Sequence, residues 1–174
     1  EEYKRELEYL KNDMGYSPYT GEIVVIGVLD VERNRGMVYF QAPGKEIDDF
    51  EENGIKFKQM TERQMLESFW NGALDYNEFI SFNGRGFDVP FMMLRSAIHK
   101  IRPTKDLMSN RYLYSQRFDA KHVDLVEQLS FYGARKKESL HLITRAFGIK
   151  SPKSDGVSGN DVGRLFREGK YEEI

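Results

Sequence analysis

The sequence contains no cysteine, which excludes disulfide bonds, zinc–thiolate centres and cysteine nucleophiles. It has no apolar run near the roughly 18 residues that a membrane-spanning helix requires. No signal peptide is visible either. We therefore expect an intracellular, cytoplasmic protein with no membrane partner, whose protein partners the sequence leaves unknown.

The 174 residues, of which 40% are hydrophobic and 31% charged, are typical of one soluble domain with a sizeable core. We expect a single domain over residues 1–174. The chain begins with Glu1 rather than Met and stops within a helical pattern, so we also expect truncation at both ends.

Charge is unevenly distributed, although the net charge is only −2. Residues 95–153 contain 13 Lys and Arg against 5 Asp and Glu, while the remaining residues contain 13 against 23. One interpretation is a basic face for a polyanion such as nucleic acid. The other is chance clustering of solvated surface charge.

The most informative stretch is residues 78–95, EFISFNGRGFDVPFMMLR. Alternating apolar residues predict a strand, two glycines predict a tight loop, and a helical pattern follows to about Ile101, before Pro103. Asp88 falls at the start of that helix. It is either an N-cap or a carboxylate placed to hold a cation or ligand. Its neighbours Asn83, Phe87 and an exposed Arg85 favour a site for phosphate and metal.

The rest of the chain predicts an α/β sheet with helices packed on it. A continuous apolar run from Ile23 to Leu29, within residues 22–30, predicts a central strand covered on both faces. A hairpin turn at 34–36 leads to a second strand at 37–40, and 55–57 predicts a short third strand. The acidic residues 42–54 are expected to form a solvated loop. Helices are expected at 1–11, from Thr61 with a Gln64 capping box, at 138–147 with its apolar residues inward, and from 160.

Two further segments carry open alternatives. Residues 103–120 are irregular and interleave aromatic side chains with arginines. These either stack on bases or tether the loop to the core. His122 and Asp124 invite a catalytic interpretation, but without a nucleophile a hydrogen-bonded structural pair near the site is favoured.

The segment Asn83 to Phe91 resembles the second exonuclease motif of DEDD 3′–5′ exonucleases, above all those of family-B DNA polymerases and their stand-alone prokaryotic relatives. That motif is Asn, two or three residues, an aromatic residue and Asp, often followed by proline. The segment from His122 to Leu125 extends the resemblance. The resemblance implies a ribonuclease-H-like mixed sheet with an antiparallel hairpin, flanked by helices.

The resemblance also implies chemistry. DEDD enzymes hydrolyse phosphodiester bonds at a site with two Mg²⁺ or Mn²⁺ ions, held by four acids from three motifs. Asp88 would be a catalytic residue and a metal ligand. The implied substrate is a single-stranded 3′ end of DNA or RNA, and the implied substrate-binding residues are Asn83, Gly84, Arg85, Phe87, His122 and Asp124.

The chain departs from the family pattern in two places. Residues 1–20 contain no strand with the Asp-x-Glu of the first motif, which belongs just before the strand that starts at Ile23, and the third motif, an Asp preceded four residues earlier by Tyr or His, belongs after the helix that begins near Tyr171. We expect both to lie just outside the given range, and we expect the chain alone to be inactive. Two alternatives are a catalytically inactive module that binds nucleic acid, and a structural domain in which Asp88 is only a cap.

Overall fold

The computed structural model describes residues 3, 14–151 and 159–174. The chain divides into two compact units. Unit 1 comprises Glu1–Phe69, Leu94–Ile101 and Val157–Ile174, and unit 2 comprises Trp70–Met93 and Arg102–Gly156. The prediction of a single domain stays a prediction. Within the described ranges, no helix combines the length and the apolar character needed to cross a membrane.

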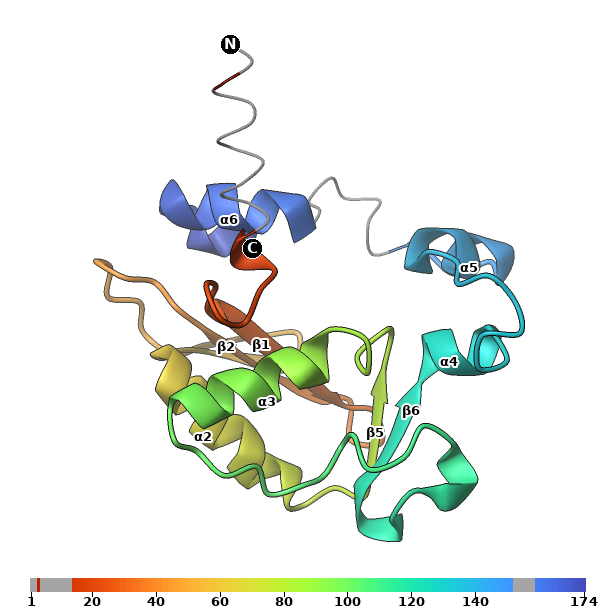
Figure 1. The fold of residues 1–174 in the computed structure, drawn as a ribbon. Coiled ribbons are helices and arrows are strands. Elements are labelled where there is room, and N and C mark those ends of the chain that lie inside the picture. The colour runs from red at the N-terminus through yellow and green to blue at the C-terminus, as the bar shows by residue number, and fades with distance from the viewer. Residues whose placement is uncertain (1–2, 4–13, 152–158) are drawn as a thin grey trace. The chain divides into compact units, whose positions relative to one another are not determined.

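Unit 1 is built on a four-stranded mixed sheet with the strand order β1-β2-β4-β3 (Figure 1). The strands are β1 (Val25–Asp30), β2 (Arg35–Phe40), β3 (Phe50–Glu52) and β4 (Ile55–Gln59). The β1–β2 pair is the predicted antiparallel hairpin, β2 runs parallel to β4, and β3 is antiparallel to β4. In the turn, Asn34 has a φ of 49° and the Asp30 carboxylate accepts from the Arg33 N–H at 2.9 Å.

Two expectations about this sheet are wrong. The apolar run does not form a central strand, because β1 is an end strand of this sheet and Val28 and Leu29 are exposed. A continuous apolar run indicates a strand but does not distinguish the edge of a sheet from its centre. The acidic segment is not wholly loop either, since it contains β3, in which Phe50 stacks on Phe57 at 4.5 Å.

The helix α2 (Glu62–Ala73) begins as predicted. The Thr61 N–H donates to Gln64 Oε1 at 2.9 Å, and the Gln64 N–H donates back to Thr61 Oγ1 at 3.4 Å. This reciprocal pair is a capping box. The helix α3 (Asp88–Ile98), which ends slightly before the expected Ile101, follows the glycine loop, while α6 (Gly159–Arg167) and the 3-10 turn η4 (Tyr171–Glu173) belong to unit 1.

Unit 2 contains the parallel strands β5 (Glu78–Ser81) and β6 (Lys121–Asp124), which lie side by side in Figure 1. Its helices are α4 (Leu125–Leu129) and α5 (Leu140–Ala146). The irregular segment before β6 holds two 3-10 turns, η1 (Leu113–Ser115) and η2 (Phe118–Ala120). In the register, Ser81 pairs with Asp124 and Phe79 with His122, so both strands end at the same level.

The fold is therefore α/β, with a mixed sheet, an antiparallel hairpin and flanking helices, as predicted. One helix differs in its packing: Ala146 and Phe147 were expected to face inward and are exposed. The helix expected at 1–11 lies outside the described residues, apart from Tyr3.

Candidate functional site

The predicted site residues lie in unit 2: Asn83 to Phe87 in the loop after β5, Asp88 at the start of α3, and His122 and Asp124 in β6. After β5 the chain makes a tight loop through Asn83, whose φ is 62°. A Cβ on Gly84 would lie 2.2 Å from Ser81 Oγ, and a Cβ on Gly86 would lie 2.6 Å from Asn83 Oδ1. Gly84 is therefore required by the close approach of Ser81, whereas a side chain at residue 86 would displace the Asn83 amide, and we call residues 83–86 the glycine loop.

Asp124 holds this loop against β6. Its carboxylate is buried and accepts from the backbone N–H groups of Asn83 at 2.8 Å, Arg85 at 3.0 Å and Val126 at 3.0 Å. The last of these bonds caps α4. One buried carboxylate thus satisfies donors of two segments that are about 40 positions apart in sequence.

His122 lies on the same strand, two residues before Asp124, and is also buried. Its Nδ1 is 3.0 Å from the Leu107 carbonyl and its Nε2 is 2.7 Å from Ser81 Oγ. Burial lowers the pKa of His122, against the opposing effect of the Leu107 carbonyl, so the ring is neutral at pH 7. Because a carbonyl only accepts, Nδ1 carries the proton and Nε2 accepts the Ser81 hydroxyl proton. His122 and Asp124 are thus each hydrogen-bonded, His122 to Ser81 at the end of β5 and to Leu107, and Asp124 to the glycine loop and to α4.

Arg85 is half-buried rather than exposed, which corrects the expectation from its position between two glycines. Its guanidinium donates to the carbonyls of Leu107 at 2.9 Å and Met108 at 3.3 Å. A guanidinium carries five N–H donors, and two carbonyls from one loop are good acceptors for part of that set. Arg85 therefore fastens the glycine loop to the start of the irregular segment.

Asp88 is exposed and is the first residue of α3. The Phe91 N–H donates to the Phe87 carbonyl at 3.0 Å, so Phe87 and not Asp88 holds the N-cap position. The pKa of Asp88 is raised, mainly because neighbouring protein removes water from the carboxylate and also because of the nearby Asp124 charge. Its own backbone N–H and His122 act in the opposite direction.

Phe87 is 41% exposed, and its ring lies 5.6 Å from that of Phe91 at a tilt of 46°. Phe87 is thus partly exposed directly before Asp88 and packs against the buried ring of Phe91. Hydrogen bonds join Asp124 to Asn83 and Arg85, and the Leu107 carbonyl links Arg85 to His122. Gly84 lies in the same loop, Phe87 follows it, and Asp88 begins α3. The part each plays with a substrate stays a prediction.

The described residues do not by themselves fit a two-metal centre. No group of three or more His, Asp or Glu side chains suited to a metal ion occurs in residues 3, 14–151 and 159–174. Of the two acids near the glycine loop, Asp124 is occupied by backbone donors and Asp88 is the exposed one. Of the two acids, Asp88 is therefore the one whose carboxylate oxygens can bind a cation.

Sequence reasoning missed several parts of the site. Ser81 and Gln116 carry no motif, yet Ser81 binds the His122 ring and Gln116 holds the His122 backbone N–H at 2.6 Å and carbonyl at 3.1 Å. The position of Ser81, two residues before the glycine loop at the end of a strand, is the one signal that singles it out.

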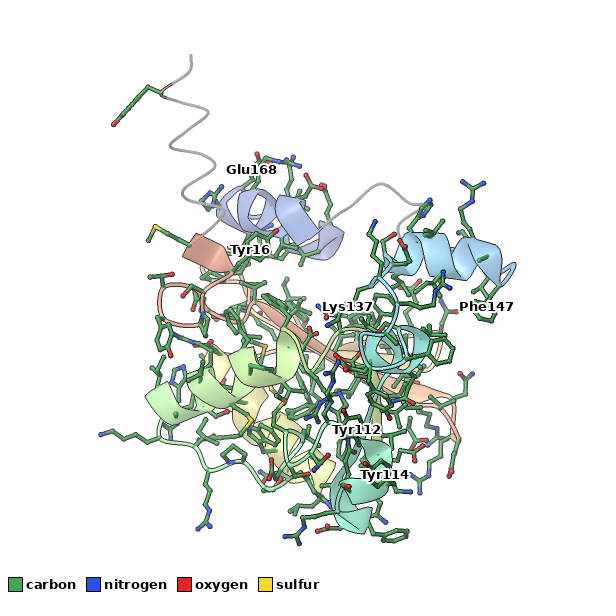
Figure 2. All side chains as sticks on the ribbon, turned by 45° about the vertical axis from the view of Figure 1, so that its right-hand side comes forward. Tyr16, Tyr112, Tyr114, Lys137, Phe147 and Glu168 are labelled. Atoms are coloured by element: carbon green, nitrogen blue, oxygen red, sulfur yellow. The ribbon has the colours of Figure 1, made fainter. Side chains whose placement is uncertain are left out.

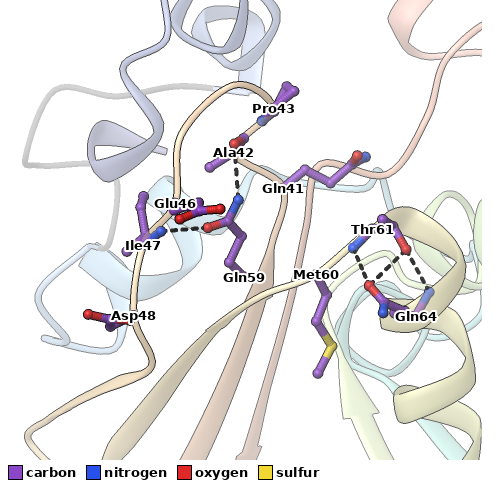
Figure 3. Close-up of a pocket in the computed structure, with 10 residues that line it drawn as sticks. All are labelled: Gln41, Ala42, Pro43, Glu46, Ile47, Asp48, Gln59, Met60, Thr61 and Gln64. Atoms are coloured by element: carbon purple, nitrogen blue, oxygen red, sulfur yellow. Dashed lines mark hydrogen bonds between the residues drawn. The ribbon is translucent and has the colours of Figure 1, made fainter.

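A cavity of about 470 Å³ lies in unit 1, lined in part by Gln59, Glu46 and Asp48 (Figure 3). The Gln59 amide spans it, accepting from the Ile47 N–H at 2.7 Å and donating to the Ala42 carbonyl at 3.1 Å. Both acids are exposed, as expected of a solvated surface. None of the predicted site residues lines this cavity.

An α/β protein with a mixed sheet, an antiparallel hairpin and flanking helices is consistent with a ribonuclease-H-like exonuclease domain. The family model of predicted 3′–5′ exonucleases related to the exonuclease domain of PolB matches residues 33–174. The chain belongs to this family. The matched range contains every predicted site residue, and a search of the curated proteins finds no match.

Proposed function

We propose that this protein is a metal-dependent 3′–5′ exonuclease that hydrolyses phosphodiester bonds in single-stranded DNA or RNA. The observation that carries the proposal is an exposed acid, Asp88, at the end of a hydrogen-bonded glycine loop in a chain of an exonuclease family. Hydrolysis builds up negative charge on phosphate oxygens, which a divalent cation such as Mg²⁺ or Mn²⁺ stabilises when bound.

In this proposal, Asp88 contributes one oxygen ligand to the cation. Phe87 packs against the terminal sugar or base, and Asn83 and Arg85 orient its polar groups, because they lie on the same loop. His122 and Asp124 are buried, so they act by holding that loop in place. Gly84 allows the loop to approach Ser81 and His122.

The test is release of mononucleotides from a 5′-labelled single-stranded oligonucleotide by the natural full-length protein in Mg²⁺ or Mn²⁺. Asp88→Asn removes the ligand charge at nearly constant shape. The expected loss exceeds the about 10–100-fold that follows from removing a group that only hydrogen-bonds to a metal ligand. Asp75→Asn, a change to an exposed acid in the turn before β5, is the matched control and keeps full activity.

A catalytically inactive module that binds nucleic acid is the second candidate, supported by the basic composition of residues 95–153. It predicts oligonucleotide binding that weakens steeply with salt and no cleavage in any divalent metal. Full activity of Asp88→Asn would count against the exonuclease assignment of this residue. Absence of cleavage by the unchanged full-length protein would favour the second candidate.

A further inference from the structure

Three tyrosines of unit 2 form a continuous aromatic row, which we call the tyrosine ladder: Tyr114, Tyr112 and Tyr132. The rings of Tyr112 and Tyr114 are stacked, with centroids 5.8 Å apart and an interplanar angle of 21°. The ring centroid of Tyr132 lies 4.8 Å from that of Tyr112, with an interplanar angle of 57°. The Arg111 guanidinium lies 5.9 Å from the centroid of Tyr132. Figure 2 shows Tyr112 and Tyr114 next to each other on the segment before β6.

The outer end of the ladder is in solvent. Tyr114 is 87% exposed and Tyr112 is 41% exposed. Rings that tether a loop to the core are buried by that contact, so tethering does not account for Tyr114. Stacked, exposed tyrosine faces are instead the kind of surface on which nucleic-acid bases stack.

The segment that carries Tyr112 and Tyr114 is fastened at both ends to the candidate site. At its start, the carbonyls of Leu107 and Met108 accept from Arg85 of the glycine loop. At its end, the Gln116 side chain joins the Asn110 carbonyl to the backbone of His122. The same hydrogen bonds therefore position the glycine loop and Tyr112 and Tyr114.

The charge around the ladder suits a polyanion. Residues 102–137 contain 8 Lys and Arg against 4 Asp and Glu. Two of the acids are taken up internally, since Asp124 binds backbone N–H groups and Glu127 pairs with Arg111 and Lys137. Arg135 and Lys136 are exposed on the turn that follows Tyr132. Exposed cations beside stacked rings favour a partner that has both phosphates and bases.

We propose that the tyrosine ladder is a stacking platform for single-stranded nucleic acid, which holds the bases upstream of the 3′-terminal nucleotide. This inference rests on the proposed exonuclease function, to which it adds a second contact region and a preference for unpaired strands. Double-stranded DNA keeps its bases stacked on each other and has no free base face to offer Tyr114.

The test measures binding by fluorescence anisotropy with the full-length protein in EDTA, so that cleavage does not interfere. The probes are a labelled trinucleotide and a labelled single strand of about 12 nucleotides. Tyr114→Ala is expected to weaken binding of the longer strand by roughly 5- to 150-fold, the range for loss of one base–aromatic stack. Binding of the trinucleotide is expected to stay unchanged, because the terminal site alone can hold it.

Three further variants make the result specific. Tyr114→Phe keeps the ring and is expected to bind like the unchanged protein. Tyr19→Ala removes another tyrosine that is 73% exposed, but in unit 1, and is expected to have no effect. Asp88→Asn is expected to lose cleavage while keeping its affinity for the longer strand, so that failure of the proposed function and failure of the ladder give different results.

Equal affinity of Tyr114→Ala and the unchanged protein for the longer strand would overturn the inference. So would an equal loss in Tyr114→Phe, which would assign the effect to the hydroxyl rather than to stacking. Circular dichroism checks that each variant is folded, and because Tyr114 is 87% exposed, its variants remove little packing from the fold.

Discussion

At the scale of single residues, the two acids near the glycine loop differ in what their carboxylates contact. Asp88 is exposed and begins a helix, whereas Asp124 is buried and accepts from three backbone N–H groups. Asp88 can therefore contact a ligand. Asp124 instead fixes the position of the glycine loop that precedes Asp88. Replacement of either acid should impair the site, but only replacement of Asp124 should also destabilise the fold.

Asp124→Ala is expected to destabilise the protein by about 3 kcal/mol, because buried donors left without an acceptor each cost about 1–3 kcal/mol. The donors in question are the N–H groups of Asn83, Arg85 and Val126. The urea midpoint of unfolding measures this effect. Asp106→Ala, which removes the acceptor of one exposed N–H, is the matched control and should cost well under half as much. Equal costs would contradict the anchoring role of Asp124.

Single residues also show where sequence reasoning ends. The sequence placed Asn83 and Arg85 in a tight loop and Asp88 at the start of the helix that follows, and the structure confirms that placement. It did not reveal that Ser81 binds His122 or that Arg85 is half-buried, because the partners, a ring about 40 positions away and the Leu107 carbonyl, are brought close only by the fold. Hydrogen-bond acceptors that are backbone carbonyls of an irregular loop cannot be identified from the residue types of that loop.

At the scale of elements, the junction of β5 and α3 depends on the absence of a side chain at residue 84. An added Cβ would lie 2.2 Å from Ser81 Oγ and 2.6 Å from Ser81 Cβ. Because Ser81 is itself held by His122, the clash cannot be relieved by a simple rotation that keeps this hydrogen bond. The loop, the end of β5 and the ring of His122 therefore form one packed arrangement.

Gly84→Ala is expected to destabilise the protein by about 1–3 kcal/mol, the usual cost of overpacking. The double variant Gly84→Ala/Ser81→Gly removes the atoms that clash and should recover part of that loss. Gly72→Ala is the control, since nothing lies within 4 Å of the added Cβ on α2, and it should stabilise by about 0.5–1 kcal/mol. Thermal unfolding of the four proteins decides between these outcomes, and Gly84→Ala as stable as the unchanged protein would contradict the packing argument.

The presence of helices and strands was predicted better than the way they pair and pack with one another. The capping box of α2 and the hairpin of β1 and β2 follow from local hydrogen bonding and turn chemistry, so a short window of sequence contains their cause. The edge position of β1 and the exposure of Phe147 follow from which segments pair and pack, and that is decided over long distances in the chain. A local pattern therefore indicates an element but not its neighbours.

At the scale of the whole chain, segments far apart in sequence converge in unit 1 on the buried carboxylate of Glu62. It accepts from the Ile23 N–H at 2.8 Å, from Arg95 Nη2 at 2.6 Å and from His99 Nε2 at 2.6 Å. Arg95 also donates to the Pro18 carbonyl at 3.1 Å. The sequence offers only a Glu in the first turn of a helix, which is common for reasons of helix dipole alone. This ion-pair cluster could not be predicted from it.

Glu62 makes the stability of the fold sensitive to acid. Burial acts to raise the pKa of Glu62, but the hydrogen bonds from Arg95, His99 and Ile23 outweigh it and hold the pKa below its usual 4.5. A carboxyl whose pKa is lowered by folding contributes stability above its unfolded-state pKa, and that contribution is lost as the pH falls through the folded-state pKa. The unfolding free energy should therefore decline as the pH falls below 4.5.

Glu62→Gln removes the charge at nearly constant shape and leaves Arg95 without its buried partner. It is expected to cost about 3 kcal/mol at neutral pH, as for other broken buried ion pairs, and to flatten the decline in acid because no proton can be taken up at this position. Thermal unfolding from neutral pH down to below pH 4.5 measures both effects. The control is Glu67→Gln, which breaks an exposed pair with Arg63 and should cost about 0.5 kcal/mol or less. If both variants kept the acid response of the unchanged protein, Glu62 would not be its source, and other carboxylates such as Glu127, whose pKa is also lowered, would have to account for it.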